Sequence, residues 1–122
     1  MEQELKIYKT TNNGVDYNNI YLKTKVSKAT GEVFEGLKAG NYMEVEKIFA
    51  EGLEKNMGSY SFYICKVNYK GEECSFTLYE NEHDTFKMIG GIGNTIRITA
   101  EAYEYNHKGK EKKALKLNFE KV

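Results

Sequence analysis

Lysine side chains are concentrated in one polar stretch near the C-terminus of the 122-residue chain. The stretch covers residues 106–118 and contains five lysines and one acidic residue: Lys108, Lys110, Lys112, Lys113, Lys116 and Glu111. Five lysines less one glutamate give it a formal charge of +4, whereas the whole chain has a formal net charge of zero. Lysine ammonium groups neutralise phosphates in nucleic-acid complexes. The pattern therefore indicates a segment able to contact an anionic ligand, and a solvated loop remains the alternative.

A second chemical feature is an aromatic pair on the outer face of a predicted β-hairpin. Lys70-Gly71 is a two-residue turn between strands predicted over 59–69 and 73–79, and such a turn fixes the register of the strands. The predicted core-facing pairs are Val67–Cys74, Cys65–Phe76 and Tyr63–Leu78. The predicted outward pairs are Phe62–Tyr79, Ile64–Thr77 and Lys66–Ser75. Outward aromatic rings can stack on nucleobases, unless the first 40 residues or a second copy of the chain cover them.

Other side chains could extend such a binding surface. Tyr60 lies at the end of the 59–69 strand, and Tyr103 and Tyr105 share the outer face of a strand predicted over 95–105. The two later tyrosines could instead form cross-strand pairs. Arg97, the only arginine, is a candidate phosphate contact, with a salt bridge to Glu101 as the alternative.

Neither a metal site nor a catalytic site is expected. Cys65, Cys74, His83 and His107 lack the close spacing of zinc ligands, and both cysteines are predicted to be buried free thiols. The glycine-rich stretch 90–93 follows a predicted helix, so it indicates a helix stop and not a phosphate loop. No nucleophile has an evident base partner. We expect a protein that is not an enzyme and that uses no cofactor.

The predicted elements are mostly strands. A strand over 41–53 should point Met43, Val45 and Ile48 inward, with a bulge at Glu46-Lys47 where the alternation breaks. A helix over 81–89 should be capped by Asn81 and Asp84, with Phe86 and Ile89 on its inner face. A polar loop over 106–113 should join the 95–105 strand, with Ala102 inward, to a last strand over 114–119. Strands are also expected over 4–9, 19–26 and 33–34.

This order of three strands, a short helix and two strands resembles the OB-fold over residues 41–122. The stretches SFTLY (75–79) and GGIGNTIRI (90–98) are similar to single-stranded DNA-binding OB domains of archaeal and phage type. The resemblance implies an all-β, five-stranded Greek-key barrel with one short helix. Residues 1–40 would be an N-terminal hairpin extension packed on it. The chain departs from the bacterial members because it has neither tryptophan nor an acidic C-terminal tail.

These features predict a sequence-tolerant single-stranded DNA-binding protein, with DNA favoured over RNA, of the kind used in DNA replication and repair. The predicted contact residues are Tyr60, Phe62, Lys66, Tyr79, Arg97, Tyr103, Lys108, Lys110, Lys112 and Lys113. The alternative is a protein-interaction or oligomerisation module, such as a viral accessory or inhibitor protein, and a homo-oligomer is compatible with both. The acidic N-terminus and the absence of a long apolar stretch predict a cytoplasmic protein that does not bind a membrane.

Overall fold

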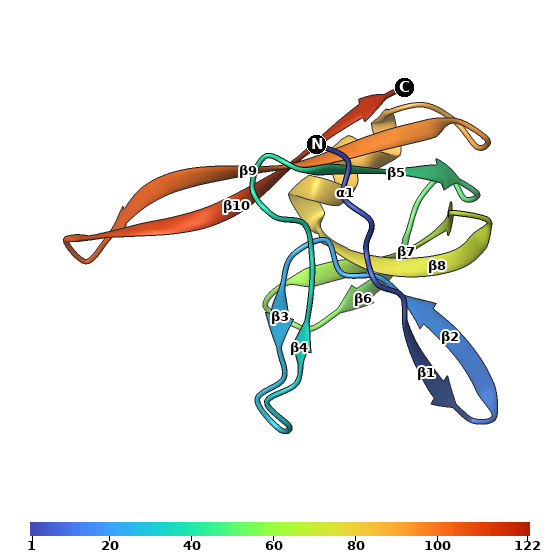
Figure 1. The fold of residues 1–122 in the computed structure, drawn as a ribbon, viewed down its shortest axis with the longest axis horizontal. Coiled ribbons are helices and arrows are strands. Elements are labelled where there is room, and N and C mark those ends of the chain that lie inside the picture. Colours follow the sequence, from blue (N-terminus) through green and yellow to red (C-terminus); the bar gives the residue numbers. More distant parts are fainter.

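The protein is built mainly from β-strands, with one short helix (Figure 1). The computed structural model describes residues 1–122. Its strands are β1 (Tyr8–Asn12), β2 (Val15–Asn19), β3 (Lys25–Val26), β4 (Val33–Phe34), β5 (Tyr42–Lys47), β6 (Leu53–Asn56), β7 (Ser61–Tyr69), β8 (Glu72–Tyr79), β9 (Thr95–His107) and β10 (Lys110–Lys121). The helix is α1 (Glu80–Met88). The prediction of an all-β chain with one short helix is thus confirmed.

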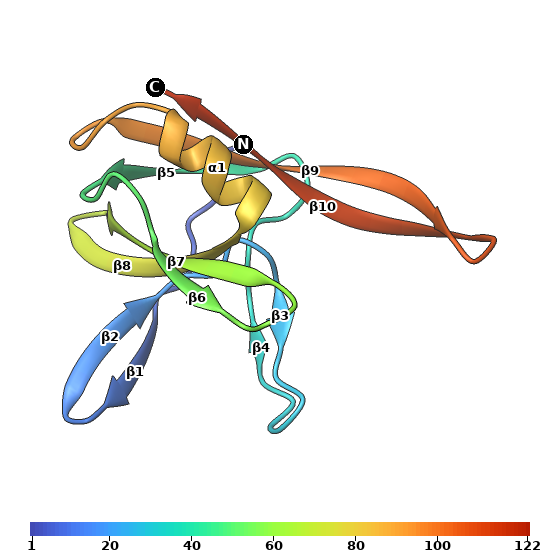
Figure 2. The same cartoon turned by 180° about the vertical axis from the view of Figure 1, so that it is seen from behind.

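The main sheet is open. Its strand order is β1-β2-β8-β7-β5-β9-β10, and β6 pairs with β7 to one side of this path. Strand β8 meets β2 through the single pair Asn19–Ser75, and β10 ends the sheet without a further partner. Helix α1 lies between the β9–β10 ribbon and the β7–β8 pair when the molecule is seen from behind (Figure 2). Because the sheet is not closed, the five-stranded barrel that the resemblance implies is not confirmed.

The β7–β8 hairpin has the predicted register. All six predicted pairs, including Phe62–Tyr79 and Cys65–Phe76, are present. The turn forms because Asn68 Oδ1 accepts a 3.0 Å hydrogen bond from the Gly71 N–H. Cys65 and Cys74 are buried free thiols, which confirms that prediction, and desolvation raises the pKa of Cys65 to about 12. The hairpin therefore presents one apolar face to the core and one mixed face outward.

The single strand predicted over 41–53 is wrong, because the chain forms β5 and β6 with an irregular connection between them. At Gly52 the chain passes so close to β7 that a Cβ would lie 2.8 Å from Cys65 Sγ. The predicted bulge is also wrong, because the pairing of β5 with β9 runs without an offset. The alternation continues through Lys47, which is fully buried, while Ile48 is only half-buried.

The Lys47 ammonium explains why a lysine occupies this inward position. Its Nζ donates hydrogen bonds to the carbonyls of Phe86, Ile89 and Gly90, at 2.9, 3.2 and 3.3 Å. These carbonyls lie at the C-terminal end of α1, where the helix dipole is negative and backbone acceptors lack helical partners. Lys47 therefore fixes the end of α1 against the sheet.

The start of α1 also differs from the prediction. The helix begins at Glu80 after Tyr79, so Asn81 and Asp84 are not its caps. Glu82 Oε1 instead accepts a 3.0 Å hydrogen bond from the Tyr79 N–H, which satisfies a donor at the helix start. Phe86 is buried as predicted and makes edge-to-face contacts with Phe76 on β8 and Phe119 on β10, with ring centroids 5.7 and 6.0 Å apart.

The loop predicted over 106–113 is wrong. Strands β9 and β10 continue through this stretch as a hairpin closed by the two-residue turn Lys108-Gly109. The resulting ribbon projects from the body at the left of Figure 1. Ala102, predicted to face the core, is exposed because it lies on this projecting part. We call residues 101–116 the arm.

The first 40 residues contribute to the same core as the rest of the chain. Leu5, Ile20, Leu22 and Leu37 belong to one cluster of 17 buried residues. The strand at 33–34 is present, but the strands predicted over 4–9 and 19–26 are misplaced. The hairpin runs from 8 to 19 around Asn13-Gly14, a dipeptide that favours tight hairpin turns. Residues 20–24 cross the molecule without strand pairing.

His83 on α1 is buried and accepts a hydrogen bond that requires an unprotonated ring nitrogen. Its Nε2 lies 2.8 Å from the Gly52 amide nitrogen, and its ring stacks on Tyr63 with centroids 3.8 Å apart. Desolvation by burial is the main cause that lowers the pKa of His83 below its ordinary value of 6.5. The neutral ring thus secures the connection between β5 and β6.

This site predicts a loss of stability in mild acid. As the pH falls below about 6.5 the unfolded chain takes up a proton at His83 before the folded protein does, so the free energy of unfolding decreases until the folded-state pKa is passed. In His83→Gln, the amide oxygen can accept from Gly52 without titrating. Urea unfolding of both proteins between about pH 7.5 and about pH 5.5 should show the steeper loss in the wild type. Equal slopes would contradict the prediction.

Candidate functional site

A groove of about 670 Å³ lies between the outer face of β7–β8 and the segment that follows β2. Its lining is mixed, with aromatic, aliphatic, hydroxyl and charged side chains. From the hairpin and its surroundings come Tyr60, Phe62, Ile64, Ser75, Phe76, Thr77, Tyr79 and Glu82, and Leu117 comes from β10. The opposite wall is residues 19–26. This volume matches ordinary ligand clefts.

One wall of the groove is aromatic and accessible. Tyr79 and Tyr60 are 55% and 53% exposed, and their ring centroids lie 6.4 Å apart. Phe62 is the direct cross-strand partner of Tyr79 and is half-buried. The cross-strand register places both rings on the outer face of the sheet. The N-terminal segment borders these rings, and Tyr79 remains exposed. An exposed aromatic group of this kind provides flat faces on which a planar ligand can stack.

The opposite wall is held rigidly by the chain that returns from β4. The Leu37 N–H donates to the Leu22 carbonyl at 3.0 Å, and the Gly36 N–H donates to Thr24 Oγ1 at 3.1 Å. Only a glycine fits at position 36, because a Cβ there would lie 2.5 Å from the Lys23 carbonyl carbon. This close packing fixes the backbone that carries Lys23 and Lys25 along the groove.

A cluster of three aromatic rings supports the base of the same wall. Tyr21 stacks on Phe34 with centroids 4.7 Å apart, and Tyr8 meets both rings edge-on at 5.5 and 5.1 Å. The Tyr8 hydroxyl also accepts a 3.0 Å hydrogen bond from the Glu35 N–H. The cluster therefore ties β1, the groove segment and β4 together.

The charged residues of the groove are two lysines and one glutamate. Lys23 Nζ lies 3.0 Å from Glu82 Oε2, and the Glu82 side chain is only 12% exposed. This ion pair links the two walls and leaves Lys25 as the unpaired charge. The groove thus carries one net positive charge beside its aromatic wall. Both lysines escaped the sequence prediction, because only the tertiary fold brings residues 19–26 beside β7 and β8.

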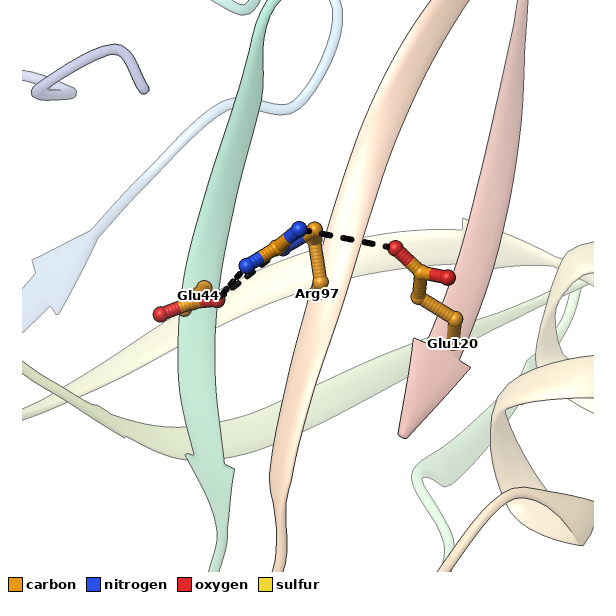
Figure 3. A network of polar contacts seen from close by, with 3 residues as sticks. All are labelled: Glu44, Arg97 and Glu120. Atoms are coloured by element: carbon orange, nitrogen blue, oxygen red, sulfur yellow. Dashed lines mark hydrogen bonds and ion pairs between the residues drawn. The ribbon is translucent and has the colours of Figure 1, made fainter. Parts of the chain in front are cut away.

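Arg97 forms ion pairs with two glutamates. Its Nε and one terminal nitrogen lie 3.0 and 2.9 Å from Glu44 Oε2, and its other terminal nitrogen lies 3.8 Å from Glu120 Oε1 (Figure 3). The guanidinium also lies 4.3 Å from the centroid of the Tyr42 ring. The alternative prediction, a salt bridge between Arg97 and Glu101, is wrong. Two carboxylates offset the charge of Arg97, so we remove it from the candidate site.

The remaining predicted residues fall into two groups. Tyr60, Phe62 and Tyr79 line the groove, and Lys66 lies farther along the same face of β7, opposite Ser75 and outside the lining. The second group lies on the arm, away from the groove lining. It consists of Tyr103, Lys108, Lys110, Lys112 and Lys113. The residues predicted to form one binding surface therefore lie in two separate places, the groove and the arm.

The chain matches no protein-family model, no curated protein and no solved structure. No three side chains among histidine, cysteine, aspartate and glutamate are grouped to hold a metal ion. The one helix is too short and too polar to cross a bilayer. The groove and the arm, which together carry most of the predicted contact residues, are the two candidate sites.

Proposed function

We propose that the protein binds single-stranded DNA in the groove, without sequence preference. The observation that carries this proposal is the exposed aromatic wall of Tyr60, Phe62 and Tyr79 facing a second wall that carries Lys23 and Lys25. Every base has a face that can stack on an aromatic ring, and lysines can hold the phosphates of any sequence. Stacking of this kind requires unpaired bases, so a duplex should bind less tightly.

The strand arrangement supports a relationship to the OB-fold, which we propose in an open form. Strand β5 pairs with both β7 and β9, and α1 lies in the chain between β8 and β9. In an OB barrel the first strand likewise pairs with the second and fourth, and ligands bind across the second and third. Here those two strands are β7 and β8, whose outer face forms one wall of the groove.

Fluorescence anisotropy with labelled oligonucleotides tests the proposal. We expect single-stranded DNA to bind at least about tenfold more tightly than the corresponding duplex, with a matched RNA strand binding less tightly than DNA. Replacing Lys25, the groove lysine that has no ion-pair partner, by alanine should flatten the salt dependence by up to ~0.7 in log–log slope, for the one phosphate that is no longer neutralised. Equal affinity for strand and duplex, or no binding at low salt, would refute the proposal.

A protein-interaction module is the second candidate. Strand β6 has a free edge, and the exposed apolar side chains Phe49, Leu53 and Met57 lie on it or beside it. A short edge strand with exposed apolar groups can accept a strand from a partner. This function predicts that the lysine and tyrosine variants of the groove leave partner binding unchanged.

A further inference from the structure

The arm extends beyond the support of the rest of the sheet. Strand β5 pairs with β9 only as far as Thr99, and residues 101–113 are all exposed. From there to the tip each strand has only the other as a neighbour. Because an isolated two-stranded ribbon is only marginally stable in water, a ligand that contacts one of its faces would also order it.

The two faces of the arm differ in chemistry. Directly paired residues share a face, so Tyr105 lies beside Lys112 and Tyr103 beside Ala114. The two tyrosines are 42% and 45% exposed, and their ring centroids lie 5.9 Å apart. Lys110, opposite His107, lies on the same face toward the tip. We call this the tyrosine face.

Glu104 and Glu111 lie on the opposite face of the arm. The tyrosine face has one acidic residue, Glu101, which pairs with Lys116 at the base of the arm. Glu104 pairs with Lys113, and Glu111 pairs with Asn106. The register makes Glu104 and Glu111 diagonal neighbours on this face, and the nearby Glu111 side chain raises the pKa of Glu104. A polyanion would therefore favour the tyrosine face, where Lys110 and Lys112 stand beside accessible rings. The sequence alone treats Lys112 and Lys113 as equivalent, whereas the register places them on opposite faces.

We propose that the tyrosine face is a second site for single-stranded nucleic acid, separate from the groove, so that one molecule can hold two strands at once. The arm shares no lining residue with the groove. The proposal extends the proposed function, because the ligand class is the same and the residues are different. Holding two strands beside each other would allow the protein to bridge them and to promote their pairing when they are complementary.

The stoichiometry of binding tests the second site. The probe is an unstructured DNA oligonucleotide of about 8 nucleotides, within the span expected for one small binding surface. We expect two oligonucleotides per wild-type chain, one per chain of the arm variant Tyr105→Ala/Lys112→Ala, and one per chain of the groove variant Phe62→Ala/Tyr79→Ala. One oligonucleotide per wild-type chain that the arm variant still binds, or two in the arm variant, would overturn the inference. If the wild type and the groove variant each bind one oligonucleotide and the arm variant binds none, the proposed groove function fails instead.

A bridging experiment provides the matched control. Wild-type protein bound to an immobilised oligonucleotide should capture a second, labelled oligonucleotide, and Lys112→Ala should reduce this capture several-fold. Lys113→Ala removes the same charge one residue away on the other face and should leave capture unchanged. Equal effects of the two substitutions would overturn the proposal. Sedimentation without DNA should show a monomer. A dimer that dissociates in the arm variant would mean that the arm is a contact between two copies of the chain. That result would overturn the second site.

Discussion

Replacing Tyr79 by alanine should weaken binding of single-stranded DNA by about 1–3 kcal/mol, or about 5- to 150-fold. The ring is 55% exposed, close to Tyr60 and on the residue that pairs with Phe62, so its loss removes a stacking face without opening the core. The variant keeps the hydrogen bond that the backbone N–H of residue 79 donates to Glu82. Fluorescence anisotropy at fixed ionic strength measures the effect, because salt alone changes such affinities strongly.

Two variants make this result specific. Tyr79→Phe keeps the ring and loses only the hydroxyl, so it should bind almost as tightly as the wild type. Tyr17→Ala removes a 41% exposed tyrosine from β2, outside the groove, and should leave affinity unchanged. Thermal unfolding of each variant must show an intact fold. Full affinity in Tyr79→Ala, or an equal loss in Tyr17→Ala, would contradict a stacking role for the groove.

The register of the β7–β8 hairpin could be predicted from the sequence to the residue. Tyr63, Cys65 and Val67 form one apolar face opposite Leu78, Phe76 and Cys74, and Lys70-Gly71 fixes the turn between the two runs. A one-residue slip would move every apolar side chain of one strand to the solvent face, which makes the register strongly specified. The aromatic wall of the groove was predictable for the same reason.

The arm contains the same Lys-Gly turn at 108–109, yet its sequence predicts a loop. Beyond Ala100 neither face of the ribbon is buried, so polar residues occupy both faces and the alternation that indicates a strand is absent. The signal that could have identified the hairpin is the turn dipeptide alone. Its lysines were found, but their division between two faces depends on a register that only the structure provides.

The second wall of the groove could not be predicted because it depends on tertiary contacts. Residues 20–24 form no strand, and their position comes from hydrogen bonds to residues 36 and 37 and from the burial of Ile20 and Leu22. Such contacts join segments that have no shared pattern in the sequence. At the same place β2 pairs with β8 through Asn19 and Ser75, a contact that the sequence does not indicate.

Replacing Lys47 by methionine should reduce the free energy of unfolding by about 2–4 kcal/mol. Its side chain is fully buried, and its ammonium donates to three carbonyls at the end of α1 while lying 4.7 Å from the centroid of the Phe86 ring. Methionine keeps most of the volume and removes every donor, so these acceptors would be left buried without the ammonium. Urea unfolding should show a lower midpoint with an unchanged m-value.

Lys87→Met is the matched control, because Lys87 is an exposed lysine in the last turn of the same helix. Its substitution should change stability by at most about 0.5 kcal/mol. The sign of the Lys47 result decides between two effects. Desolvation lowers the pKa of Lys47, so burying the charged amine has a cost, whereas the three hydrogen bonds and the negative end of the helix dipole favour it. A Lys47→Met protein as stable as the wild type would mean that the cost of burial equals the gain. A loss near the expected size would mean that this inward lysine, which interrupts the apolar pattern of β5, holds the helix against the sheet that carries the groove.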